Sequence, residues 1–141
     1  MKLSLARDIL DGAIAAGRKR GAKPLAVVVM DAGGNLVMAA REDGCSLFRH
    51  TIAQAKAMGA LGMGADTRVL AERAKGNPVF FQSVSAVVDG KIAFSPGGVL
   101  VNDPEGTLLG AVGISGDTGE TDDDCARAGI AAAERGNGAS E

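Results

Sequence analysis

One short segment holds most of the side chains that could do chemistry. In chain order they are Arg41, Asp43, Arg49, His50 and Lys56. His50 is the only histidine of the chain, so it is the candidate for an axial haem ligand or a general base. The alternative is a surface or interface histidine. Arg49 and Lys56 would each pair either with a ligand carboxylate or with Asp43.

Cys45 is the next candidate ligand, because it lies five residues before His50 in a chain without tyrosine. Nucleophilic catalysis by this pair has little support, since no third group that would orient the histidine is evident. No catalytic residue is therefore assigned. Cys45 and Cys125 are expected to be free thiols, as in a reducing compartment.

A glycine-rich corner, "GAVGISGDTGETDDDC", runs from Gly110 to Cys125. Ser115 and Gly116 lie where free N–H groups at a helix start could hold an anion. The alternative is simple capping of the last helix, for which the candidates are Asp117, Thr118, Thr121 and Asp122. No metal site is predicted from Asp122–Asp124, because three adjacent acids on a helix point in different directions.

A second glycine pair, Gly97-Gly98, follows Pro96. Adjacent glycines admit the close approach of another backbone or of a ligand, or they only form a turn into the next strand. This loop and the segment 113–116 adjoin strands that are expected to be neighbours. They would then form two walls of one pocket.

The apolar pattern predicts the elements that position these residues. A helix capped by Ser4 ends near Arg20, and a hairpin follows with strands at 25–31 and 36–42. The remaining predicted elements are helices at about 47–63 and 67–76, strands at 83–88, 91–94, 99–102 and 107–115, and a helix at about 121–135. The tail 136–141 is expected to fray. This order predicts an α+β fold, with an antiparallel sheet of about five strands and helices packed on it.

Composition limits the classes of function. The chain has 141 residues, of which 46% are hydrophobic, so one domain over residues 1–141 is expected. The net charge of −2 is interspersed and aromatic residues make up only 3%, which argues against nucleic-acid binding. No apolar run is long enough to span a bilayer, and no signal sequence is evident. No membrane association and a cytoplasmic location are therefore expected.

Several segments together carry a resemblance to a known family. They are 29–34, 41–44, 53–57, 96–99, 110–116 and 122–125. In this order they resemble the GlcG/HbpS family, which also occurs as the C-terminal domain of PduO. The resemblance implies a profilin-like fold, homo-oligomers and, in some members, bound haem. The chain departs from the family at Cys45, where alanine is usual, and at Arg49-His50, which some relatives replace by small or apolar residues.

The sequence thus predicts a small-molecule-binding protein of the GlcG/HbpS type, with haem or a related tetrapyrrole as the ligand. The candidate binding residues are His50, Arg49, Cys45, Lys56, Gly97, Gly98, Ser115 and Gly116. Two alternatives remain open: an enzyme acting on a small organic acid through Arg49, His50 and Lys56, and an oligomeric accessory protein without catalytic activity. Homo-oligomers are also expected because the helix around Ala53–Ala60 has an unusually small apolar side.

Overall fold

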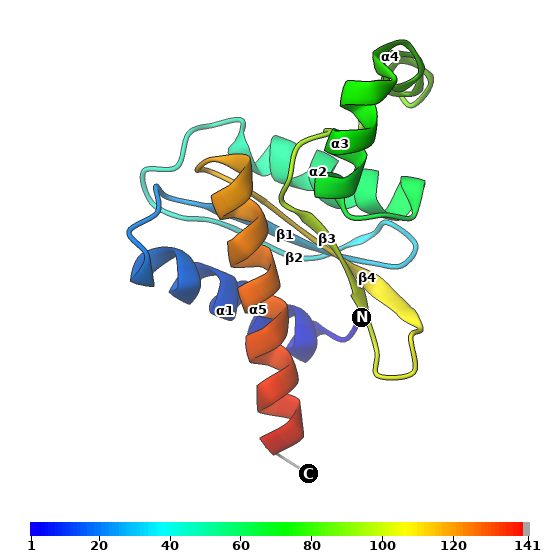
Figure 1. Cartoon of the computed structure of the whole chain (residues 1–141). Helices are drawn as coiled ribbons and strands as arrows, with labels where there is room; N and C mark the ends of the chain where they lie inside the picture. Colours follow the sequence, from blue (N-terminus) through cyan, green and yellow to red (C-terminus); the bar gives the residue numbers. More distant parts are fainter. Residues whose placement is uncertain (140–141) are drawn as a thin grey trace.

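The centre of the fold is a four-stranded antiparallel sheet with the strand order β2-β1-β4-β3 (Figure 1). The computed structural model describes the backbone of residues 1–139 and the side chains of residues 1–136. The elements are α1 (Leu3–Lys19), β1 (Ala26–Asp31), β2 (Leu36–Arg41), α2 (Arg49–Met63), α3 (Thr67–Gly76), α4 (Pro78–Val87), β3 (Gly98–Asn102), β4 (Leu108–Ser115) and α5 (Gly119–Ala139). The predicted α+β class is confirmed, with four strands in place of about five.

The two faces of the sheet are covered by different helices because side chains alternate along each strand. Val27 and Val29 of β1 belong to the core formed with α1 and α5. Val28 and Met30 belong to a second core formed with α2. The sheet therefore separates two apolar layers, one beneath α1 and α5 and the other beneath α2. Among the helices within residues 1–139, none has the length and hydrophobicity that crossing a membrane requires.

The ends of the helices differ in part from the prediction. Lys2, not Ser4, precedes α1, and no side chain caps that end. At α5 the Thr118 hydroxyl accepts a hydrogen bond from the N–H of Thr121, so one of the predicted capping residues does cap. Helix α5 also extends to Ala139, past the predicted end at Arg135. The last two residues of the predicted tail, 140 and 141, lie outside the described residues.

The predicted hairpin over 83–94 is wrong. Pro78 occupies the first turn of α4, where its missing N–H costs nothing, and the helix continues through Val87. Residues 91–94 have no regular structure. Phe81 is the buried residue of α4 and packs edge-on against Phe94, with 4.9 Å between the ring centres. A short apolar run can be strand or helix, and here the proline at its start favoured the helix.

Helices α3 and α4 leave the body of the molecule as an arm (Figure 1). Helix α3 lies beside α2 and β3, whereas α4 extends beyond α3, away from the sheet. We refer to residues 78–88 as the α4 arm. Among the candidate residues, Arg49 and His50 begin α2, at the end of that helix away from α3, and Lys56 lies midway along it.

Candidate functional site

The best-defined polar pair of the candidate region is buried. Lys56 lies on the face of α2 that packs on the sheet, and its Nζ donates hydrogen bonds to the Ile114 carbonyl (2.9 Å) and to Asp122 Oδ2 (3.1 Å). The two side chains are only 3% and 1% exposed. Burial lowers the pKa of Lys56 and raises the pKa of Asp122, while the charge of each partner opposes the shift of the other. The Lys56 ammonium group therefore already binds other groups of the protein.

The glycines beneath α2 let its backbone approach the sheet. Gly98 pairs with Gly113 in the register of β3 and β4, so the predicted neighbourhood of the two glycine segments is confirmed. A Cβ on Gly113 would lie 1.9 Å from the Ala53 carbonyl oxygen, and one on Gly98 would lie 2.3 Å from that of Lys56. The two glycine segments expected to form the walls of a pocket are thus in close contact with the backbone of α2.

The other two glycines of the prediction have similar local roles. Gly97 adopts φ +129°, and a Cβ there would lie 3.0 Å from Lys56 Nζ. Gly116 packs against the chain before β1, since its Cβ would lie 2.3 Å from the Pro24 carbonyl oxygen. Close backbone contact explains all of these glycines. A ligand that binds at the corner after β4 would therefore have to contact the residues around these glycines.

Ser115 links this region to the start of α2. Its buried hydroxyl accepts a hydrogen bond from Arg49 Nη1 at 3.2 Å. Arg41 Nη1 donates to the Cys45 carbonyl. Among side chains 1–136, no carboxylate lies within ion-pair distance of Arg41 or Arg49. The predicted pairing of Arg49 with Asp43 is therefore not formed, and two guanidinium groups retain donors for an anion.

His50 lies at the first turn of α2 and is exposed. One ring nitrogen, Nδ1, lies 2.9 Å from the Leu47 carbonyl, which can only accept, so Nδ1 carries the proton in this arrangement. Nε2 is then the acceptor, and it lies 3.3 Å from the Thr51 hydroxyl. Leu47 and Phe48 beside it are 67% and 70% exposed. His50 points away from Lys56, as the helical spacing predicts.

Cys45 and Cys125 are both buried and free, as predicted. They lie in different cores, Cys45 with α2 and Cys125 with α1 and α5, so the sheet separates them. Burial raises the pKa of both thiols, and the nearby Arg41 and Arg49 only partly oppose this at Cys45. Both groups are therefore neutral thiols near neutral pH.

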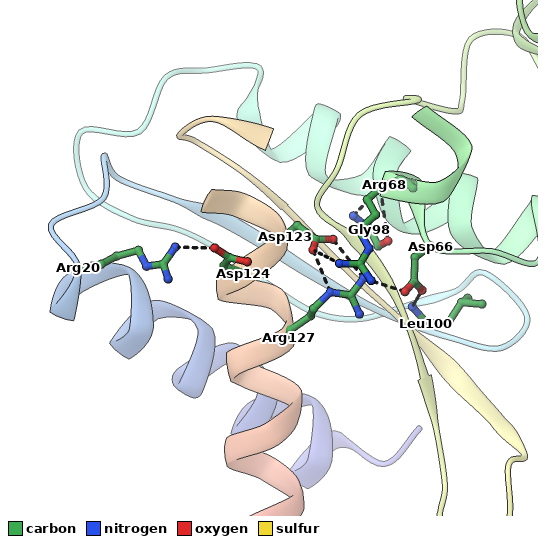
Figure 2. Close-up of polar contacts among 9 residues, drawn as sticks. Arg20, Asp66, Arg68, Gly98, Leu100, Asp123, Asp124 and Arg127 are labelled. Atoms are coloured by element: carbon green, nitrogen blue, oxygen red, sulfur yellow. Dashed lines mark hydrogen bonds and ion pairs between the residues drawn. The ribbon is translucent and has the colours of Figure 1, made fainter. Parts of the chain in front are cut away.

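The three consecutive aspartates of α5 point to three different partners, as expected from the helix. Asp122 faces Lys56. Figure 2 shows the other two, with Asp123 against Arg127 and Asp124 against Arg20. Arg127 also reaches Asp66 at 2.9 Å. No group of three or more metal-ligating side chains occurs within the described residues, and the acids instead tie α5 to its neighbours.

Sequence reasoning missed a cleft at the far end of α2. It has a volume of about 310 Å³ and is lined by Ala32, Gly33, Gly34, Met58, Leu61, Gly62, Val88, Lys91 and Ile92. Its three walls are the turn between β1 and β2, the end of α2 and the segment after α4. The incorrect strands at 83–94 hid the third wall. Only the apolar character of these residues could have indicated it.

The fold and the site together define a class of protein. The chain is an α+β protein with one helix on one face of an antiparallel sheet, two on the other and an exposed histidine at the start of the central helix. The family model described as "Haem degrading protein HbpS-like" matches residues 1–131, and the chain belongs to this family. The resemblance seen in the sequence is thereby confirmed.

Solved structures agree with this assignment. A double mutant of HbpS from Streptomyces reticuli is 29% identical, with a TM-score of 0.78 over 93% of this chain and 85% of that one. A structure described as a PduOC:heme complex is 26% identical, with a TM-score of 0.83 over 94% of both chains. The Klebsiella pneumoniae protein ORFY shares the fold at 22% identity and a TM-score of 0.86, over 95% of this chain and 90% of that one. No protein of curated function matches the sequence significantly.

Proposed function

We propose that this protein binds haem or a related tetrapyrrole on the surface where α2 begins. Its family is described as haem-degrading and HbpS-like, and the similar PduOC structure is a complex with heme. These comparisons support the class of ligand. The residues around His50 support the location of the binding site, and the rest of the proposal depends on these residues.

The orientation of His50 is the observation that carries the proposal. A histidine ligates iron through an unprotonated ring nitrogen, and a backbone carbonyl on the other nitrogen fixes that tautomer. The Leu47 carbonyl does this at Nδ1. Nε2 is left as an acceptor on the exposed side of the helix, where only the weak contact with Thr51 has to be given up. A bound haem would supply the redox and ligand-exchange chemistry of its iron.

The surroundings of His50 match the two parts of a haem. Leu47 and Phe48 provide an exposed apolar surface of the kind that covers a porphyrin face. Arg49 and Arg41, which have no carboxylate partner among the described side chains, are suited to the propionates. Apolar and cationic groups thus accompany the ligand nitrogen.

The other predicted residues contribute less directly. Lys56 is paired with Asp122, so it does not compete for a propionate. Ser115 orients Arg49, and Gly97, Gly98 and Gly116 permit the close packing described above. Cys45 remains the second candidate ligand, but its buried thiol has a raised pKa and would have to be exposed and deprotonated.

Haemin titration tests the proposal. The wild type should give a saturable Soret band with one defined stoichiometry. His50→Ala should shift the band and weaken binding at least tenfold, which corresponds to about 1.4 kcal/mol, and added imidazole should restore the spectrum. The control Thr51→Ala removes only the hydroxyl near Nε2 and should bind at least as well as the wild type. Unchanged binding by His50→Ala would exclude His50 as the ligand, and Cys45→Ser would then be tested.

Arg41 and Arg49 also favour a second candidate, the enzyme acting on a small organic acid. Two guanidinium groups beside an exposed histidine could bind and act on a carboxylate. Lys56 drops out of this hypothesis because Asp122 holds it. Calorimetric titration with small carboxylic acids separates the two candidates: binding that Arg49→Gln abolishes, in a protein that does not bind haemin, favours the enzyme. Binding of neither ligand favours the accessory protein.

Self-association and a cytoplasmic location complete the proposal. The small residues of α2, from which the sequence predicts oligomers, serve another purpose, because Ala53 and Ala57 pack against the sheet of their own chain. Support for self-association comes instead from the exposed apolar residues of the surface. The free thiols Cys45 and Cys125 are consistent with a reducing compartment. Sedimentation of the purified protein tests the first inference.

A further inference from the structure

The α4 arm is unusual for an exposed helix because it lacks charge. No acidic or basic residue occurs between Asn77 and Val88. A helix that is apolar around most of its circumference is normally buried. In this chain α4 extends past α3, away from the sheet (Figure 1).

The apolar side chains of the arm are largely in water. Val79, Phe80 and Val87 are 74%, 50% and 82% exposed, and Phe81 is the one buried residue of the helix. These exposed residues belong to both ends of the helix. A surface of this kind in a small protein marks an interaction site.

The cleft at the base of the arm has a matching character. Apart from Lys91, its lining side chains are apolar or absent, with Met58, Leu61 and Ile92 as the large ones. Gly62 adds open space, since a Cβ built there meets no atom within 4 Å. Each chain thus carries an apolar projection and an apolar recess, joined through Val88.

We infer that the α4 arm of one chain docks into the cleft of a second copy, and that the second copy returns the contact. The inference rests on the self-association proposed above and names its surface. Projection and recess are adjacent, so a two-fold axis beside them would bring each arm to the other copy's cleft. An uncharged arm brings no charge repulsion to a copy of itself. The arm's own chain cannot fill the recess with α4, because the residues that follow α4 are its wall.

Variants can remove the contact without damaging the fold. Val79→Asp places an acid in the first turn of α4 and Val87→Lys places a base in the last turn, both favoured by the helix dipole. The double variant keeps the net charge. Gly62→Trp fills the cleft from its open side. Leu3→Asp/Leu108→Lys is the matched control, because it also exchanges two exposed apolar residues for opposite charges.

Sedimentation equilibrium at micromolar concentration measures the outcome, with far-ultraviolet circular dichroism to verify the fold. The wild type and the control should associate with the same dissociation constant. In the arm variant and in the cleft variant, this dissociation constant should be at least tenfold higher. Wild-type association in either variant would overturn the inference, since arm and cleft are two halves of one contact. A monomeric wild type would overturn self-association as well. Haemin binding is measured in a separate titration, so a failure of the haem proposal is distinguished from a failure of the proposed contact between copies.

Discussion

The Lys56 ammonium and the Asp122 carboxylate meet at 3.1 Å inside the protein, although the two residues lie 66 positions apart in the chain. One belongs to α2 and the other to α5, which lie over opposite faces of the sheet. The pair links these two helices next to the short connection between β4 and α5. Asp122 Oδ1 also accepts the Asp117 N–H, so the carboxylate serves both the corner and the lysine.

Breaking this pair should strongly destabilise the protein. Lys56→Met leaves a buried carboxylate without its cation, at an expected cost of about 3–5 kcal/mol in the free energy of unfolding. Adding Asp122→Asn removes the charge and keeps an acceptor for Asp117, so the double variant should recover part of the loss. Urea unfolding of the single and double variants measures this. A double variant no more stable than Lys56→Met would show that charge is not the main term.

The glycines beneath α2 should not tolerate a methyl group. Gly98→Ala would place a Cβ against the Lys56 carbonyl, at a cost at the upper end of about 1–3 kcal/mol. The cause is the approach of α2, because Gly98 is not among the glycines with positive φ. Gly62→Ala on the open side of α2 is the control and should leave the melting temperature unchanged or raise it. Equal melting of both variants would contradict the close approach.

Acid should weaken the contact between Asp117 and the segment before β1. The N–H groups of Lys23 and Thr118 bind the carboxylate and lower the pKa of Asp117 below its ordinary value of 3.8. Its contribution to stability is therefore present above that value and is lost as the pH falls through the lower, folded pKa. Asp117→Asn should lose this part of the pH dependence between about pH 5 and 2. Thermal unfolding against pH measures it.

A comparison with Asp31 makes that measurement specific. The pKa of Asp31 is also lowered, chiefly by the Asn35 N–H in the turn between β1 and β2. Asp31→Asn should therefore remove a separate part of the acid dependence, and the double variant should remove both. If Asp117→Asn retains the wild-type profile, the contact with Lys23 is not maintained in solution.

Both thiols should be inaccessible in the folded protein. Cys45 and Cys125 are buried on opposite faces of the sheet, and burial raises the pKa of each. A thiol reagent at neutral pH should react slowly with the native protein and titrate two groups per chain after unfolding without reductant. Recovery of fewer than two would indicate a disulfide or a modification.

Much of this arrangement follows from local signals in the sequence. The spacing of small apolar residues predicts α2, and the glycines at its contact predict a close approach. The predicted strands 25–31 and 36–42 match β1 and β2 to within one residue. These features depend on short periods and on residues near in the chain, which a sequence displays directly.

Other features depend on packing between distant segments. The sequence around Lys56 and around Asp122 gives no sign that the two residues pair, because each is typical of an exposed, solvated charge. The α4 segment illustrates the opposite difficulty, because its apolar run suits a strand or a helix equally and only Pro78 distinguishes them. The cleft forms only where the segment after α4 meets the end of α2, so no single motif in the sequence could predict it.

The first two turns of α5 constrain insertions and deletions in the corner that precedes them. Its successive acids face α2, Arg127 of the same helix and Arg20 at the end of α1. Each residue of a helix advances about 100° around the axis. Inserting one residue between Gly116 and Thr121 would rotate this whole set and place Thr121, which has no charge, opposite the buried Lys56. The length of that short corner is therefore expected to be as strictly constrained as the identity of the acids that follow it.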